Sequence, residues 1–255
     1  MENALLVGLS RQMALSRQLE VIANNVANMN TTGYKSDGAL FEEFIAPTAQ
    51  DDGTSRADSA VHFTNDRGIW HDFTQGPVQH TGNPLDVAID GDGYFVVQTP
   101  NGERYTRNGA FQVNGAGQLV TADGMPVLGD NGPITFQQTD HNVAITPDGF
   151  VSVNEGNVTN VEARRGKLRL VRFARAQNLI KEGASNFRAP NGVDPEPATN
   201  AKLQQMAVEK SNVNSVLEMT RLIDITRSYA QVSALLQQTN DMRKNAISQL
   251  AEVPT

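Results

Sequence analysis

Histidines and closely spaced carboxylates are the residues of this chain whose types could bind a metal. The four histidines are too few and too dispersed to indicate a zinc triad. They are His62, His71, His80 and His141. Asp86, Asp90 and Asp92 surround a glycine, but a calcium loop needs an oxygen ligand at its third position and a glutamate at its twelfth. Counted from Asp86, those positions hold Ala88 and Val97. The sequence therefore predicts no metal site.

Catalytic and cofactor-binding motifs are equally hard to find. Gly91-Asp92-Gly93 and Gly115-Ala116-Gly117 lack the third glycine and the strand-to-helix setting of a dinucleotide loop. The chain has no Gly-x-Ser-x-Gly elbow, no phosphate-binding loop and no cysteine that could act as a nucleophile. Paired carboxylates such as Glu42-Glu43 are typical of a solvated surface. We therefore expect a protein that is not an enzyme and that binds no cofactor.

The composition is that of a globular chain long enough to bury a core. It has 255 residues, of which 39% are hydrophobic and 19% charged. The net charge is −7 and no run of Lys and Arg forms a basic face, so we expect no binding to nucleic acid. No stretch approaches the roughly 20 apolar residues that span a bilayer. The N-terminus shows no secretory signal.

The N-terminal segment, 1–35, is predicted to be an amphipathic helix from residue 3 to about residue 29. Its apolar residues recur at steps of three or four. Those that we expect in an interface are Leu5, Leu9, Met13, Leu19, Ile22 and Val26. The helix is predicted to end at the polar residues that follow, which are Asn28, Asn30 and the Thr31-Thr32-Gly33 run. Gly33 is expected to be a left-handed cap at the helix end.

The middle of the chain predicts β structure. Residues 36–80 read as an extended or looped connector, and the short β-branched and aromatic runs of 81–182 predict an antiparallel β domain. Asn-Gly and Asp-Gly dipeptides divide these runs and favour tight turns, because both residues tolerate positive φ. They lie at 101–102, 114–115, 123–124, 131–132 and 148–149. The prolines of 183–213 predict an extended return segment.

The C-terminal segment, 214–255, is predicted to be a second amphipathic helix. Ser215 followed by Glu218 fits a capping box. With no Gly or Pro between Ser215 and Leu250, the helix can exceed 30 residues. Its interface stripe is predicted to be Leu222, Ile225, Tyr229, Val232 and Leu236.

The fold class is therefore predicted to be α+β, with terminal helices flanking the β domain. An isolated amphipathic helix is only marginally stable in water. The apolar face of each terminal helix therefore needs a partner surface to pack on. Periodicity alone leaves two arrangements open. The helices either form a hairpin packed on their own β domain or pair as a coiled coil completed by neighbouring subunits.

Three segments resemble the flagellar axial proteins that build the rod and hook. The first is a run of signature residues after the N-terminal helix: Asn24, Asn25, Ala27, Asn28, Thr32, Gly33, Tyr34 and Lys35. The second runs from Gly82-Asn83-Pro84-Leu85-Asp86 through Tyr105-Thr106-Arg107-Asn108-Gly109. The third begins at Glu209 and contains Ser211, Asn212 and Val213. The resemblance thus touches the start, middle and end of the chain.

The resemblance implies a basal-body rod subunit whose terminal helices pair as a coiled coil along the axis of the rod that crosses the periplasm. Within the family, the opening segment and Leu40-Phe41-Glu42-Glu43-Phe44 are most like a proximal rod subunit, and a distal rod subunit is the alternative. Its implied partners are copies of itself, other proximal and distal rod proteins, and the flagellar type III export apparatus. It would be exported without a cleaved signal peptide and would not insert in the membrane.

A function of another class remains open from sequence alone. A β-rich module for cell-wall glycan would use exposed aromatics, and Trp70, Tyr94 and Tyr105 are the candidates. Aromatics in strands more often belong to a core.

Overall fold

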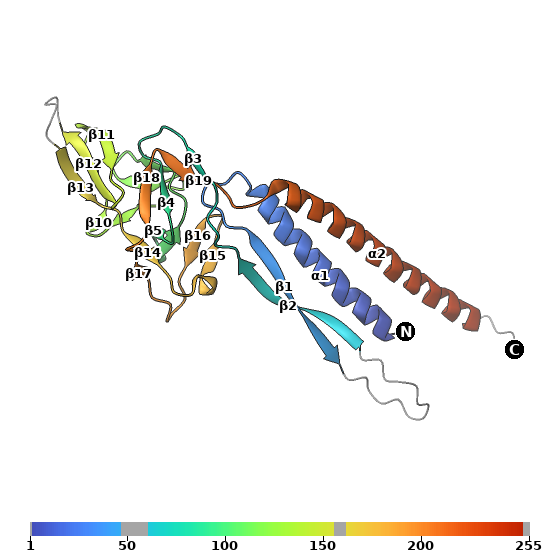
Figure 1. Cartoon of the computed structure of the whole chain (residues 1–255). Helices are drawn as coiled ribbons and strands as arrows, with labels where there is room; N and C mark the ends of the chain where they lie inside the picture. The colour runs from blue at the N-terminus through green and yellow to red at the C-terminus, as the bar shows by residue number, and fades with distance from the viewer. Residues whose placement is uncertain (1, 47–60, 156–161, 252–255) are drawn as a thin grey trace. The chain divides into compact units, whose positions relative to one another are not determined.

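The computed structural model describes residues 2–46, 61–155 and 162–251, which divide into two compact units. The helical unit comprises Met1–Ala27, Asp37–His71 and Asn214–Thr255, and the β unit comprises Asn28–Ser36 and Asp72–Val213. The predicted α+β class is confirmed, with a helix near each end of the sequence and a central antiparallel β region between them (Figure 1).

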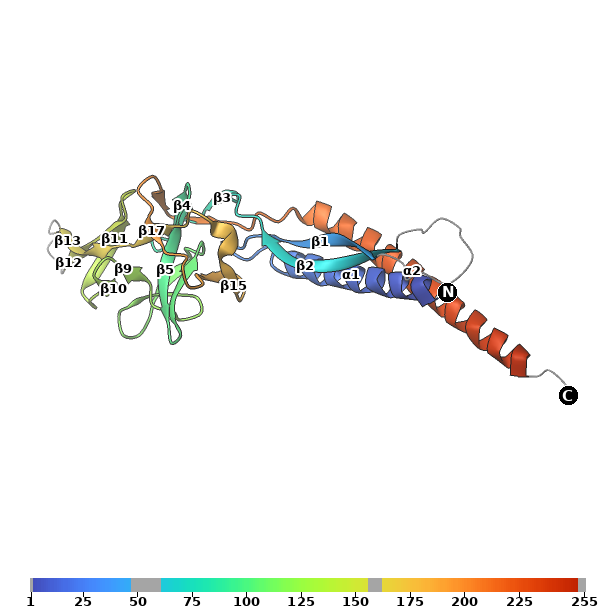
Figure 2. The same cartoon turned by 90° about the horizontal axis from the view of Figure 1, so that it is seen from below.

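The helical unit is built on two helices that lie side by side and antiparallel, α1 (Glu2–Ala27) and α2 (Ser215–Ala251) (Figures 1 and 2). Asn25 Nδ2 donates to Glu218 Oε2 at 3.4 Å near one end of the pair. Further along, Gln12 Nε2 donates to the hydroxyl of Tyr229 at 3.2 Å. Neither helix in the described chain is long and apolar enough to cross a membrane.

The helix ends differ from the sequence prediction in two details. Gly33 does take the left-handed conformation, with φ +69°, but α1 ends earlier, at Ala27. The cap of α2 is Asn214 rather than Ser215, because Asn214 Oδ1 accepts from the backbone N–H of Leu217 at 3.2 Å. The Glu218 side chain instead meets Asn25 and Arg221, so the predicted capping box is not the one used.

A long antiparallel hairpin replaces part of the predicted connector. Strand β1 (Asp37–Ala46) pairs with β2 (Val61–His71), and both contact α1. The register shifts between Leu40 and Phe41, which marks a β-bulge. A residue larger than glycine at position 38 would displace the Trp70 ring, since a Cβ there would lie 2.1 Å from Trp70 Nε1. Residues 47–60 of the connector lie outside the described part.

The β unit contains the remaining strands, all in antiparallel pairs. Its largest sheet has the order β15-β16-β6-β5-β14-β17, and a second has the order β11-β12-β13. The six strands of the largest sheet are β5 (Tyr94–Thr99), β6 (Gly102–Thr106), β14 (Leu170–Arg172), β15 (Ile180–Glu182), β16 (Asn186–Arg188) and β17 (Glu196–Pro197). Those of the second sheet are β11 (Asp140–Ile145), β12 (Phe150–Glu155) and β13 (Glu162–Lys167).

Smaller ladders complete this unit and use the predicted return segment as paired strands. The pairs are β18-β4, β19-β3, β7-β8 and β10-β9. Their strands are β3 (Val78–His80), β4 (Val87–Asp90), β7 (Phe111–Val113), β8 (Leu119–Thr121), β9 (Leu128–Gly129), β10 (Gly132–Pro133), β18 (Lys202–Gln205) and β19 (Ala207–Glu209). A 3-10 turn, η1, spans Ala176–Asn178.

Two apolar clusters form the core of the β unit, and β5 separates them. Phe95 and Val97 pack in one cluster, and Tyr94 and Val96 in the other. This follows from the alternation of side chains along a strand, which sends neighbouring residues to opposite faces. Strand β5 is therefore apolar on both faces. This agrees with its place inside the sheet, where β6 pairs with one of its edges and β14 with the other.

Gly33 illustrates how tightly the segment between α1 and β1 is held in the β unit. A Cβ at this position would lie 2.4 Å from the backbone nitrogen of Asn108, and φ is +69°. Gly124 has a similar φ of +79° but open space around it. The two glycines thus share a left-handed backbone conformation, which would strain any other residue, and they differ in steric room.

We expect Gly33→Ala to destabilise the β unit by more than about 3 kcal/mol, because it adds a backbone clash to the strain. Gly124→Ala should cost only about 1–2 kcal/mol, from the left-handed backbone alone. Denaturant unfolding followed by near-ultraviolet circular dichroism of the buried tyrosines measures both. Equal losses for the two variants would contradict the packing described here.

Candidate assembly interface and a buried ionic cluster

The predicted interface residues of α2 lie along the helix pair and are half-buried. They are Leu222, Ile225, Tyr229, Val232 and Leu236. Leu236 approaches α1 so closely that a Cβ at Gly8 would lie 2.6 Å from its Cδ2 atom. The Leu236 side chain thus packs directly over the backbone of Gly8.

The predicted residues of α1 divide between covered and exposed positions. Ile22 is buried, and Leu5, Leu19 and Val26 are half-buried. Leu9 and Met13 remain 45% and 67% exposed. Some of the predicted interface side chains of α1 are thus covered by other parts of the chain, and the others are exposed to solvent.

Further apolar side chains that the stripe prediction did not include are also exposed on both helices. On α1, Leu6 joins Leu9 and Met13 at spacings of three and four, which places them on one face. On α2, Val216, Met219 and Ile223 repeat that spacing, with exposures of 75%, 46% and 52%. Leu235, Met242 and Ile247 are exposed further along α2. Rows of large apolar side chains open to water indicate surfaces that bind a partner.

Asn25 connects the elements of the helical unit at one end. Its amide nitrogen donates to the carbonyl of Asp37 at 2.8 Å, and its amide oxygen accepts from the Asp37 N–H at 2.9 Å. The Asn25 side chain thereby makes the two hydrogen bonds to Asp37, the first residue of β1, that the backbone of a neighbouring strand would make. Asp37 Oδ1 also lies 2.6 Å from Nδ1 of His71, the last residue of β2.

A buried ionic cluster lies in the β unit. Glu209, which has no solvent-exposed surface, pairs with Lys35 Nζ at 2.5 Å and with Arg107 Nη1 at 3.3 Å. Its Oε1 atom also accepts from the N–H of Gly76 at 2.9 Å. Lys35 Nζ donates in addition to the carbonyl of Thr74 at 2.6 Å. The cluster holds two cations against one carboxylate, so its formal charge is +1.

Burial governs the electrostatics of this cluster. It lowers the pKa of Lys35 below the ordinary value for lysine, while the Glu209 carboxylate opposes this shift and Arg107 adds to it. Burial also raises the pKa of Tyr94, whose ring lies 5.1 Å from the Arg107 guanidinium carbon. Keeping Lys35 charged inside the protein therefore depends on Glu209.

Several other signature residues belong to the β unit that holds this cluster. Tyr34 is fully buried, and Lys181 Nζ lies 3.7 Å from the centre of its ring. The side chain of Asn212 accepts from the N–H of Ser36 at 2.8 Å and donates to the carbonyl of Asp72 at 2.8 Å. Ser211 is buried, Asn28, Thr32 and Val213 are half-buried, and Asn24 and Ala27 are exposed. Arg107 and Glu209 were not predicted as site residues, although both lie within the family-like motifs.

The aromatic platform for sugars is not present. Tyr94 and Tyr105 are only 4% and 5% exposed and belong to one core cluster of the β unit. Trp70 is exposed but belongs to the helical unit. The idea of a three-residue platform was therefore wrong, because two of its members are core residues.

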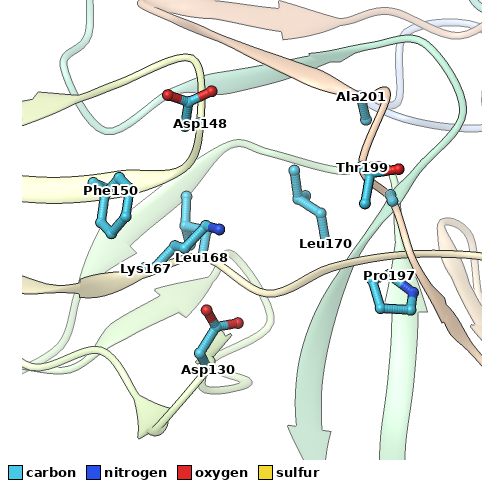
Figure 3. A pocket seen from close by; sticks show the side chains of 10 residues that line it. Asp130, Asp148, Phe150, Lys167, Leu168, Leu170, Pro197, Thr199 and Ala201 are labelled. Atoms are coloured by element: carbon cyan, nitrogen blue, oxygen red, sulfur yellow. The ribbon is translucent and has the colours of Figure 1, made fainter.

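A cleft of about 580 Å³ in the β unit has a mixed lining (Figure 3). Asp130 and Asp148 lie at its two sides, with Lys167 between them. Its remaining lining consists of Thr199 and apolar side chains, without a histidine or serine to form a nucleophile and base. Among the described residues, no three His, Asp or Glu side chains gather as a metal site.

The rows of exposed apolar side chains on α1 and α2 are typical of a subunit with surfaces for assembly. Comparison with known protein families gives three matches. They are a flagella basal body rod protein model over residues 5–35, a flagellar hook protein FlgE/F/G D1 domain over 88–153, and a flagellar basal body rod FlgEFG protein C-terminal model over 204–250. Each matched segment supplies one charge of the buried cluster: Lys35, Arg107 and Glu209.

Similar proteins cover the chain from end to end. The flagellar basal-body rod protein FlgF of Caulobacter vibrioides is 41% identical over 99% of this chain and 100% of its own length. FlgF of Mesorhizobium japonicum is 36% identical over 98% of each chain. FlgG of Bacillus subtilis is 31% identical over 97% of this chain and 99% of its own.

The chain belongs to the flagellar basal-body rod protein family, and within it the similarity favours the FlgF type over the FlgG type. Proteins of this family are structural subunits rather than enzymes.

The ionic cluster predicts an unequal response to removing each charge. Glu209→Gln leaves Lys35 and Arg107 buried without a counter-charge, and we expect a loss of about 3–5 kcal/mol. Lys35→Met leaves the Arg107–Glu209 pair intact and should cost only about 1–3 kcal/mol, for the lost hydrogen bonds of Lys35 Nζ to Glu209 and to the carbonyl of Thr74. Denaturant unfolding of the β unit measures both.

The double variant Lys35→Met/Glu209→Gln serves as the control for this comparison. It should lose less stability than the two single variants added together, because it removes a cation and the carboxylate at once. Additive losses would mean that the three charges do not interact as described.

Proposed function

We propose that this chain is an FlgF-type subunit of the proximal flagellar rod, the hollow drive shaft used for motility. In this proposal the segments 1–35 and 214–255 pack as a coiled coil with neighbouring copies and with other proximal and distal rod proteins. The β unit, whose residues lie between these two segments in the sequence, forms the body of the subunit. A FlgG-type place in the distal rod is the alternative within the family.

The observation that carries the proposal is the set of apolar side chains left exposed on α1 and α2 after the two helices have paired. Leu6, Leu9 and Met13 on α1 have exposures of 50%, 45% and 67%. Burying a side chain of this kind contributes roughly 1.5–3 kcal/mol. Contacts with neighbouring copies therefore supply free energy that the single chain cannot obtain.

We further propose that the subunit reaches the rod through the flagellar type III export apparatus without a cleaved signal peptide. The support is the family resemblance, together with a cysteine-free sequence that has no disulfide to hinder passage as an unfolded chain. Helices that gain part of their stability on assembly fit the same route, since they are easy to unfold beforehand.

Hydrogen exchange tests whether the helices depend on assembly. In the free chain, amides of residues 1–30 and 215–250 should exchange faster than those of β5, because the helices have few covered apolar contacts. In isolated basal bodies the same amides should become protected. Helices as protected as β5 in the free chain would count against a role in assembly.

A charge on an exposed helix face should block assembly without unfolding the subunit. Ile223 is 52% exposed, so Ile223→Asp should leave the helix content and the β unit of the free chain unchanged. Buried in an interface, the same carboxylate is costly. We expect loss of motility and loss of the chain from isolated basal bodies.

Gln231→Asp provides the matched control, since it places the same charge at an exposed polar position of α2. It should support motility. Normal motility with Ile223→Asp would contradict the proposed interface.

A further inference from the structure

The helix α2 extends beyond the helix on which it packs. The contacts of Asn25 with Glu218, of Gln12 with Tyr229 and of Gly8 with Leu236 set an antiparallel register. In this register Glu2, the first residue of α1, lies opposite a position no later than 242, whereas α2 continues to Ala251. Residues 244–251, the α2 extension, therefore lie beyond the first residue of α1.

The α2 extension continues the face that packs on α1. Positions 236, 243 and 247 follow the stripe of Tyr229 and Val232 at helical spacing. Ile247 is 67% exposed. Lys244, also exposed, lies three residues before Ile247 and hence on the same side of the helix. The extension thus presents an apolar side chain beside a cation.

A groove of complementary character lies between α1 and β2 in the same helical unit. It has a volume of about 510 Å³ and is lined on its apolar side by Met13 and Ala14, with Ser10 beside them. Met13 is 67% exposed, and the small residues next to it leave room for another side chain. The groove is therefore suited to a branched apolar side chain.

Acidic side chains line the other side of the groove. Arg17 lies 3.0 Å from Glu20 and 3.3 Å from Asp66, so one cation faces two carboxylates. The side chains of Glu20 and Asp66 remain 64% and 42% exposed. This excess of negative charge favours an incoming cation such as Lys244.

The extension of one chain cannot reach the groove of the same chain. Ile247 lies beyond the first residue of α1 in the antiparallel register, so it is about 20 Å along the helix axis from Ser10 at a rise of 1.5 Å per residue. No Gly or Pro occurs between Ser215 and Leu250 to bend α2 back. A second copy is the occupant that the geometry allows.

We propose that the α2 extension of one copy docks in the α1–β2 groove of a second copy, with Ile247 beside Met13 and Ala14 and with Lys244 facing Glu20 and Asp66. Extension and groove are different parts of one chain, so the contact is heterologous and can repeat from one copy to the next. This inference rests on the proposed function and specifies which parts of neighbouring copies meet.

Cysteine cross-linking tests the contact directly, because the chain has no cysteine of its own. In basal bodies isolated from cells that carry Ala14→Cys together with Ile247→Cys, mild oxidation should give a disulfide-linked dimer of the chain. Ala14→Cys with Gln249→Cys is the matched control, since Gln249 is also exposed but lies two residues further along α2 and hence on another side of the helix. The control should give several-fold less dimer.

Charge exchange provides a second readout that does not depend on cysteines. Lys244→Glu should lower the amount of the chain in basal bodies by about two- to fivefold, as expected for a partly exposed ion pair. Adding Glu20→Lys should restore it. Single variants must keep the helix content of the free chain, which circular dichroism checks.

The outcomes separate this inference from the proposed function. Suppose that the chain is present in basal bodies but that the Ala14→Cys/Ile247→Cys variant gives no more dimer than the control and that charge exchange restores nothing. The docking contact is then wrong and the rod assignment stands. If the wild-type chain itself is absent from basal bodies, both are overturned.

Discussion

A carboxylate held away from water has to be balanced by cations and donors, and Glu209 finds its two cations in distant parts of the sequence. Lys35 follows the N-terminal helix, Arg107 belongs to the central β region, and Glu209 itself precedes the C-terminal helix. Because the free energy of each charge depends on the other two, the cluster links the packing of these three segments in the β unit. The β unit is thereby closed around the two segments that lead to α1 and α2.

The helical unit follows a different physical rule. Its polar contacts, such as those of Asn25 with Asp37 and Glu218, fix how the helices and the hairpin meet. Its apolar side chains are only partly covered, in contrast to the two closed cores of the β unit. A subunit with one complete core and one incomplete set of helix faces can fold alone and still gain free energy on assembly.

Several elements were predictable because they depend on local patterns. The Asn101-Gly102 dipeptide lies where β5 turns into β6, and Asp148-Gly149 lies between β11 and β12, as the tolerance of Asn, Asp and Gly for tight turns led us to expect. The β1–β2 hairpin was missed, since its strands mix polar and apolar residues and contact α1 on a surface that no local pattern reveals. The same applies to the cap of α2, where Asn214 and Ser215 are both good candidates by residue type.

By itself the sequence determined the two helices, the antiparallel β region and, through its motifs, the family, because periodicity, turn residues and ordered signatures are properties of neighbouring positions. Only the tertiary structure decided that Lys35, Arg107 and Glu209 share one buried cluster and that Tyr94 and Tyr105 are core residues. It also decided which apolar side chains α1 and α2 cover in each other and which stay exposed. These features depend on residues far apart in the chain, whose proximity follows from packing and burial rather than from any local preference.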